Sequence, residues 1–311
     1  MQKRKKTIKK PNRINMVFGI RGNTYKTRLS EVACRLVKDF EKKKIQYCVE
    51  KSLAREIFEK CKHKVKPGRQ KNVKDLVSSS DFIISIGGDG TFLATAKYVS
   101  DKRVPIIGVN LGKLGFLAET PPSKISKFIT DITNDKYKIE ERMVLEAGTS
   151  ILPGRKIYGL NEIVISQSGI VKTIELQAYY NGQMVISYLA DGLVVSTPTG
   201  STGYSLSAGG PIISPGADVV VLAPICPHTL TSRPIILPDS GVLKIKVESK
   251  VPVMVTADGN SNIKLKSTAF VEIKKAHYKI KLAKQLGSNY FKVLNNKLLW
   301  GVDVRKHIKT K

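Results

Sequence analysis

The sequence contains few cysteines and no long hydrophobic run. None of its cysteines forms a CxxC pair, so neither a disulfide framework nor a cysteine-rich zinc site is indicated, and reduced thiols in a cytoplasmic protein are expected. The longest apolar stretch, Val219 to Cys226, contains Pro224 and is far shorter than the roughly 20 residues that span a bilayer. We therefore expect no membrane partner. The four cysteines are Cys34, Cys48, Cys61 and Cys226.

Several familiar nucleotide-binding motifs are also missing. No GxxxxGK[ST] loop is present, which excludes a Walker-type nucleotide binder, and no HRD or DFG set is present, which excludes a protein-kinase fold. The first predicted strand leads into Gly19-Ile20-Arg21-Gly22, which lacks the GxGxxG dinucleotide fingerprint. Any phosphates must therefore be held by a different loop.

Acidic residues are outnumbered, with 25 Asp and Glu against 53 Lys and Arg and a net charge of +28. The basic residues are spread along the chain, and only residues 1–11 form a dense cluster, which we expect to be a disordered basic tail. No long apolar segment follows this tail, so we expect that it is not a secretory signal. No zinc finger, helix-turn-helix or aromatic RNA-binding motif accompanies the charge, which disfavours a nucleic-acid partner and fits anionic substrates.

The pattern of apolar residues divides the chain into two predicted domains. Strand-like and helix-like segments alternate in residues 12–122, which predicts an α/β N-terminal domain with a parallel sheet. Residues 137–285 contain many short β-rich runs, among them 157–165, 269–274 and 278–282, and predict a predominantly β, sandwich-like C-terminal domain. Asn181-Gly182 predicts a hairpin turn. The final segment, 286–311, is predicted to pack back on the first domain.

One glycine-rich loop follows a buried strand in the first domain. The strand Phe82 to Ile86 runs directly into Gly87-Gly88-Asp89-Gly90-Thr91. Glycines let a ligand approach the main chain, and converging N–H groups can bind a phosphate, so Gly87, Gly88, Gly90 and Thr91 are predicted to bind phosphate. An aspartate beside a polyphosphate needs a bridging cation or takes a proton during the reaction, and both belong to phosphoryl transfer. A plain Asp-Gly turn is the alternative.

Three polar segments stand out in the second domain. Asn161-Glu162 lies inside the apolar run 158–165, where adjacent side chains point to opposite faces of a strand, and this pair could grip a vicinal diol such as ribose. The run Asp191 to Pro211 combines glycines with hydroxyls and predicts a capped helix start that offers N–H groups to an anion. Asp258-Gly259 by itself predicts a hairpin turn.

Together these segments resemble the NAD kinase family. The resemblance rests on Gly87 to Thr91, Leu114 to Leu117, Asn161-Glu162, Asp191-Gly192, Thr197 to Pro211, Ala223 to Thr229 and Asp258-Gly259. The first loop is shared with lipid kinases of the same superfamily, whereas the Asn-Glu pair and the Thr-Pro-Thr-Gly-Ser-Thr run are specific. The family usually has alanine where this chain has Gly203, and often glutamine where it has Asn260.

The resemblance implies transfer of the γ-phosphoryl group of ATP to the 2′-hydroxyl of the adenosine ribose of NAD, with Mg²⁺ but without an assigned side-chain metal ligand. Asp89 would be the catalytic residue and accept the hydroxyl proton. Assembly as a homo-oligomer, a dimer or tetramer, is also implied. The residues expected to bind NAD are Asp89, Gly90, Phe116, Asn161, Glu162, Lys172, Asp191, Thr202, Gly203, Tyr204, Ser205 and Asn260.

Two other functions remain possible from the sequence. A lipid or sphingoid kinase of the same superfamily would need an apolar substrate groove and would not need the Asn-Glu pair. A basic nucleotide-binding or nucleic-acid-binding protein could keep the pocket without catalysis.

Overall fold

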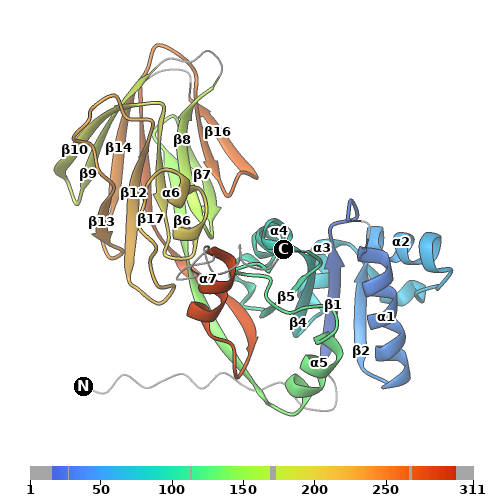
Figure 1. The fold of residues 1–311 in the computed structure, drawn as a ribbon. Helices are drawn as coiled ribbons and strands as arrows, with labels where there is room; N and C mark the ends of the chain where they lie inside the picture. Colours follow the sequence, from blue (N-terminus) through green and yellow to red (C-terminus); the bar gives the residue numbers. More distant parts are fainter. Residues whose placement is uncertain (1–15, 27, 113, 169–172, 266–267, 299–311) are drawn as a thin grey trace, which may run out of the picture. The chain divides into compact units, whose positions relative to one another are not determined.

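A computed structural model describes residues 16–26, 28–112, 114–168, 173–265 and 268–298. The chain divides into two compact units (Figure 1). Unit 1 contains the described residues up to Glu140 and again from Lys281, and unit 2 contains Glu141–Ile280. The predicted basic tail, residues 1–11, lies outside the described residues. Within the part of the chain that is described, no helix is long and apolar enough to cross a bilayer.

Unit 1 is built on a parallel sheet with the strand order β17-β5-β4-β1-β2-β3. Its strands are β1 (Val17–Gly22), β2 (Gln46–Glu50), β3 (Gln70–Lys71), β4 (Phe82–Gly87), β5 (Ile106–Asn110) and the last part of β17 (Ala269–Gln285). Its helices are α1 (Leu29–Lys42), α2 (Lys51–Cys61), α3 (Val73–Ser78), α4 (Asp89–Val99), α5 (Ile125–Thr133) and α7 (Tyr290–Leu298). Single-turn helices η1 (Pro67–Arg69) and η2 (Ser100–Lys102) complete it.

Helices cover both faces of this sheet, which is why its central strands are apolar throughout. All six residues of β4 are buried. On one face, the sheet residues Phe18 and Ile84 share a core with α1, α2 and α5. On the other face, Phe92 of α4 packs so closely over Gly108 that a Cβ there would lie 3.1 Å from the ring. The predicted α/β domain with a parallel sheet is confirmed.

Unit 2 consists of two sheets that share one apolar core. One sheet has the order β10-β9-β14-β17, with β6 beside β17 and β7 beside β6, and the other has the order β13-β12-β11-β8-β15-β16. The strands are β6 (Tyr137–Thr149, which begins in unit 1), β7 (Leu152–Gly159), β8 (Glu162–Gln167), β9 (Ile174–Tyr180), β10 (Gln183–Ala190), β11 (Gly192–Ser196), β12 (Val219–Ile225), β13 (Ile235–Pro238), β14 (Leu243–Glu248), β15 (Val253–Ala257), β16 (Ser261–Leu265) and the first part of β17. The sandwich-like prediction is confirmed.

Two Asn/Asp-Gly turns join neighbouring strands of unit 2. Asn181 and Gly182 connect β9 to β10 with φ of 49° and 84°, and Asp258 and Gly259 connect β15 to β16 with φ of 49° and 67°. Positive φ at both positions is typical of the tight hairpin turn whose twist matches the strands. Both predicted hairpins are therefore confirmed.

Two predicted runs differ from the observed strands. The run 157–165 is not one strand, because the chain bends at Leu160 and Asn161 between β7 and β8. Conversely, the separate runs 269–274 and 278–282 belong to one long strand, β17. A short helical segment, η3 (Gly200–Thr202) and α6 (Tyr204–Ser207), follows β11.

Candidate functional site

In unit 1, the glycine-rich loop forms the start of α4 at the carboxyl end of β4. Gly88 is the N-cap, so the first N–H groups of the helix have no partner within it. A Cβ on Gly88 or Gly90 would lie in open space, and neither glycine has positive φ. The fold itself therefore does not require glycine at these two positions, whereas a ligand that approaches the main chain would. Gly87 differs, because a Cβ there would lie 2.2 Å from Oγ1 of Thr91.

A small cavity opens beside this helix start. It has a volume of about 270 Å³, and Gly87 and Gly88 line it. Two cations, Lys26 and Arg28 from the loop after β1, also line it. Helix N-termini and basic side chains both favour anions, so the cavity suits a phosphate group. The remaining lining residues are Asn110, Leu111 and Gly112.

The carboxylate of Asp89 accepts hydrogen bonds from a turn of the chain that follows β5. Its Oδ2 accepts the N–H of Phe116 at 2.9 Å, and its Oδ1 accepts the N–H groups of Leu117 and Ala118 at 3.0 and 2.9 Å. Gly115 makes this approach possible, because a Cβ at that position would lie 2.1 Å from Oδ1 of Asp89. The carboxylate is thus held in one orientation at the first position of α4.

The C-terminal helix α7 supplies a fourth donor to this carboxylate. Nζ of Lys297 lies 3.4 Å from Oδ2 of Asp89 and 4.3 Å above the centre of the Phe116 ring. The same ring lies 6.2 Å from the ring of Tyr290, at the start of α7. Phe116, which the family resemblance implies as an NAD-binding residue, is therefore part of the surroundings of Asp89 within unit 1.

In unit 2, the carboxylate of a second aspartate also accepts three backbone N–H groups. The carboxylate of Asp258, in the β15–β16 turn, accepts the N–H groups of Leu160, Asn161 and Glu162 at 2.8, 2.8 and 3.1 Å. These three donors converge only because the backbone bends there, which is why 157–165 cannot be one strand. The expectation that the side chains of Asn161 and Glu162 point to opposite faces was therefore wrong.

The bend brings both side chains to the same place beside Gly203. A Cβ built on Gly203 would lie 3.4 Å from Oε2 of Glu162 and 3.6 Å from Nδ2 of Asn161. Within the described part of the chain, Oδ1 of Asn161 and Oε2 of Glu162 are buried and have no hydrogen-bond partner, and the same is true of Oγ of Ser205, which faces Gly210. Buried polar atoms almost always have partners, so Asn161 and Glu162 are candidates for contact with a ligand.

The segment after β11 holds the bend at Leu160 and Asn161 in place. Oγ1 of Thr197 donates to the carbonyl of Leu160 at 2.7 Å, and its N–H donates to the carbonyl of Asn161 at 2.8 Å. A Cβ on Gly200 would lie 2.1 Å from that Asn161 carbonyl oxygen, so glycine is required. Oγ of Ser201 accepts the N–H of Ile213 at 3.0 Å, and this hydrogen bond ties the segment to Ile213.

Burial changes the protonation of Glu162. Desolvation, and secondly the negative charge of Asp258, raise the pKa of Glu162 from 4.5 to about 7. The pKa of Asp258 is also raised by burial, although the three backbone N–H groups oppose that rise. Near neutral pH Glu162 can therefore either donate or accept a hydrogen bond, which suits a hydroxyl-bearing ligand.

The structure places the other predicted NAD-binding residues at several points of unit 2. Thr202 and the half-exposed Tyr204 adjoin Gly203 and Ser205. Asn260 is exposed in the β15–β16 turn, where its amide donates to the Asp258 carbonyl at 2.8 Å. Lys172 lies outside the described residues.

Asp191 is not brought to the same cluster. Ser196 pairs with Glu162 across β11 and β8, and Asp191 precedes Ser196 by five residues. At about 3.3 Å per residue, the separation along the strand is roughly 16 Å. Asp191 instead lines a separate cavity of about 730 Å³ together with His228.

The described residues contain no group of three or more His, Cys, Asp or Glu side chains that could hold a metal ion. The carboxylate of Asp89 already accepts four hydrogen bonds or ion-pair contacts. Mg²⁺ typically binds through one or two carboxylates, waters and substrate phosphates. The donor set of this chain thus fits a magnesium ion that is carried mainly by a polyphosphate.

The sequence did not predict several residues around Asp89 in unit 1 and around Asn161 and Glu162 in unit 2. Lys26 and Arg28 follow β1 of the parallel sheet. Their position beyond the carboxyl end of this strand could have indicated a ligand-binding role. Gly115 and Lys297 gave no local signal, because their partner Asp89 is far away in the sequence. Asp258 was expected to form only a turn.

Comparisons with known proteins agree with the two-part organisation. Residues 18–137 match the family model for the ATP-NAD kinase N-terminal domain, and residues 160–285 match that for the ATP-NAD kinase C-terminal domain. An NAD kinase from Bacteroides fragilis is 37% identical over 298 residues, which cover 93% of this chain and 100% of the relative. An NAD kinase from Caldanaerobacter subterraneus is 41% identical over 231 residues, which cover 73% of this chain and 82% of the relative.

Solved structures show the same fold. A yeast NADH kinase complexed with NADH has a TM-score of 0.84 at 24% identity, over 93% of this chain and 89% of the yeast chain. An NAD kinase from Archaeoglobus fulgidus in complex with ATP has a TM-score of 0.72 at 22% identity, over 91% of this chain and 99% of the archaeal chain. On the strength of its two matched domains and its full-length relatives, this chain belongs to the ATP-NAD kinase family.

Proposed function

We propose that this protein phosphorylates the 2′-hydroxyl of the adenosine ribose of NAD with ATP and so forms NADP. The single observation that carries the proposal is the pair of buried side chains of Asn161 and Glu162 beside Gly203, each with an oxygen that has no partner among the described residues. An amide and a carboxyl group together suit the hydroxyls and heteroatoms of a nucleoside. A lipid substrate would leave these buried groups without partners, at a cost of about 1–3 kcal/mol for each group.

Unit 1 supplies the groups for the phosphoryl transfer. The open glycines at the start of α4, with Lys26 and Arg28 beside them, favour binding of the ATP phosphates. In the reaction, the bond between the ribose oxygen and the γ-phosphorus forms, and the bond from that phosphorus to the β-phosphate oxygen breaks. ADP leaves with the electron pair, and Asp89 accepts the hydroxyl proton. Asp89 mainly orients the hydroxyl, because the proton moves late in a loose transition state.

Mg²⁺ is part of the proposal as a companion of ATP. It neutralises charge on the phosphates when bound. We further propose that the protein acts in the cytoplasm and assembles as a homo-oligomer, a dimer or tetramer, as the family resemblance implies.

An assay of the purified chain with NAD, ATP and Mg²⁺ tests the proposal, with NADP measured by chromatography. We expect NADP and ADP in equal amounts. If NAD is left unchanged while a lipid alcohol is phosphorylated, the superfamily alternative is correct. Salt-dependent RNA or DNA binding without any NADP would instead support the non-catalytic hypothesis.

A further inference from the structure

The C-terminal helix α7 places one cation beside Asp89, and the proposed function gives that cation no role. Tyr290, Val293, Leu294 and Lys297 are spaced i, i+3, i+4 and i+7 and therefore form one stripe of the helix. Val293 and Leu294 are buried in unit 1. A lysine on an otherwise apolar inner stripe is unusual, and its ammonium meets the carboxylate of Asp89.

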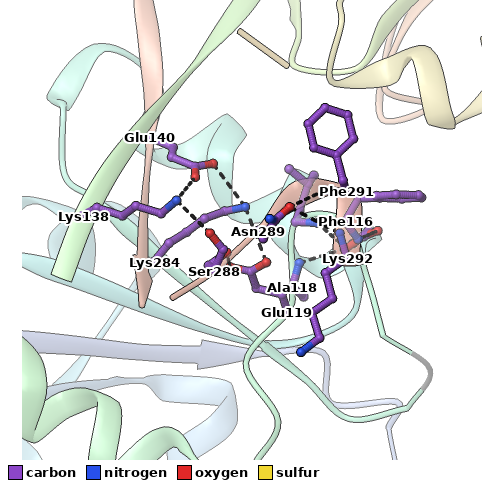
Figure 2. A network of polar contacts seen from close by, with 12 residues as sticks. Phe116, Ala118, Glu119, Lys138, Glu140, Lys284, Ser288, Asn289, Phe291 and Lys292 are labelled. Atoms are coloured by element: carbon purple, nitrogen blue, oxygen red, sulfur yellow. Dashed lines mark hydrogen bonds and ion pairs between the residues drawn. The ribbon is translucent and has the colours of Figure 1, made fainter. Parts of the chain in front are cut away.

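The start of α7 is held firmly by a network of polar contacts (Figure 2). Oγ of Ser288 donates to Glu119 at 2.7 Å, and Nζ of Lys138 donates to the Ser288 carbonyl at 2.9 Å. Lys284, whose side chain is only 3% exposed, lies 3.5 Å from Glu119 and 3.2 Å from Glu140. Oδ1 of Asn289 caps the first turn by accepting the N–H of Phe291 at 2.9 Å.

Because this end is fixed, the position of Lys297 is fixed to within the reach of its own side chain. Lys297 follows Asn289 by eight residues, which corresponds to roughly 12 Å along a helix. The helix therefore presents the ammonium to Asp89, and the flexible stem of the lysine determines how far it can move.

The donors around Asp89 account for its whole capacity as an acceptor. An ionised carboxylate has about four lone-pair positions. Three are taken by the N–H groups of Phe116, Leu117 and Ala118, and the fourth contact comes from Lys297. A substrate hydroxyl that is to donate its proton to Asp89 must therefore replace one of these donors.

Among the described residues that contact Asp89, Lys297 is the donor that can leave most easily. The three N–H groups belong to one backbone turn, and moving them would reorganise the chain. The lysine contact is long at 3.4 Å, and the side chains of Lys297 and Asp89 are 35% and 28% exposed. Ion pairs of this kind contribute little to stability, so a hydroxyl can displace the ammonium at small cost.

We propose that Lys297 occupies the place of the substrate hydroxyl on Asp89 in the free protein and binds the transferred phosphoryl group during the reaction. This role rests on the proposed function. The Phe116 ring, 4.3 Å below Nζ, retains the ammonium close to Asp89 after the hydroxyl has displaced it. The γ-phosphorus must approach that same hydroxyl, so the displaced cation faces an anionic group whose charge it can stabilise.

Three variants of the full-length protein test this role by steady-state kinetics with NAD and ATP. Lys297→Met keeps an unbranched apolar side chain over Phe116 but removes the charge, and Lys297→Arg keeps the charge. Lys292→Met is the matched control, because Lys292 is an exposed lysine of the same helix. Thermal unfolding of each variant shows whether α7 remains in place.

We expect Lys297→Met to lower kcat by about 10- to 100-fold, the usual effect of losing a charge-assisted hydrogen bond in the transition state. NAD binding without ATP should be unchanged or a few-fold tighter, because a competing donor is gone. Lys297→Arg should retain most of the turnover, and Lys292→Met should match the unmodified protein. A purely structural role for Lys297 would raise KM or lower the unfolding temperature without this selective loss of kcat.

Normal turnover by Lys297→Met would overturn the role, and so would an arginine variant as slow as the methionine variant. These outcomes are distinct from failure of the proposed function. If the unmodified protein makes no NADP, the proposed function fails, whereas NADP formation at equal rates with and without Lys297 refutes only the inference about Lys297.

Discussion

Replacing Glu162 by glutamine should change how the stability of the protein depends on pH. Glutamine has nearly the same shape as the protonated glutamic acid but cannot ionise. The folded protein raises the pKa of Glu162 from 4.5 to about 7, chiefly by burial and secondly through the charge of Asp258. The folded state therefore binds a proton that the unfolded state releases between these two pH values.

The sign and size of the effect follow from proton linkage. A carboxyl group with a raised pKa in the folded state contributes stability that is fully present below pH 4.5 and is lost as the pH rises through about 7. Each tenfold change in proton affinity corresponds to about 1.4 kcal/mol, so the whole rise corresponds to about 3 kcal/mol in the free energy of unfolding. The Glu162→Gln variant avoids this loss.

Thermal unfolding of the full-length protein from pH 5 to pH 8 measures the effect. We expect the two proteins to unfold at similar temperatures at pH 5, and the glutamine variant to be more stable by about 10 °C at pH 8, at about 3 °C per kcal/mol. Glu272→Gln is the control, because Glu272 has a 51% exposed side chain and pairs with Lys274 on the surface. Parallel pH curves for the Glu162 variant and the unmodified protein would refute the reasoning.

Three further substitutions test other parts of the structure. Asp89→Asn should lower turnover by about 10²- to 10⁴-fold, as measured by NADP formation, and near-normal turnover would refute a catalytic role for Asp89. Gly115→Ala should lower turnover by at least about 10-fold, because its Cβ would lie 2.1 Å from Oδ1 of Asp89, and unchanged kinetics would show that the grip on this carboxylate is dispensable. Lys284→Met should lower the free energy of unfolding by about 3–5 kcal/mol in denaturant titrations, because Glu119 and Glu140 lose a buried cation; a change below about 1 kcal/mol would contradict this.

Local patterns in the sequence predicted the fold well because they report local geometry. The 3.6-residue stripe of α1 and the apolar run of β4 each follow from which side of an element is buried. Asn181-Gly182 was sufficient to predict a hairpin, since few other residues adopt positive φ easily. The short strand β16 was missed because Asn262 and Lys264 point outward and leave few apolar residues to recognise.

The arrangement of the candidate site could be predicted only in part. Asn161, Glu162 and Asp89 were identified as residue types suited to the chemistry, whereas their orientation depends on partners far away in the sequence. Asp258 holds the bend at Asn161 through a hydrogen bond between residues 97 positions apart, and Lys297 contacts Asp89 from 208 positions away. No periodic pattern records such contacts, and a single sequence gives no information on which distant residues meet.

The long strand β17 has a consequence for synthesis and for truncation. Its last residues pair with β5, through Leu282 and Ile106, and Lys284 then neutralises Glu119 and Glu140. Unit 1 is therefore a discontinuous domain whose edge strand emerges from the ribosome only after unit 2 has been translated. A fragment that ends at Glu140 would expose an unpaired strand edge and leave Glu119 without its cation, so we expect it to aggregate rather than behave as an independent folding module.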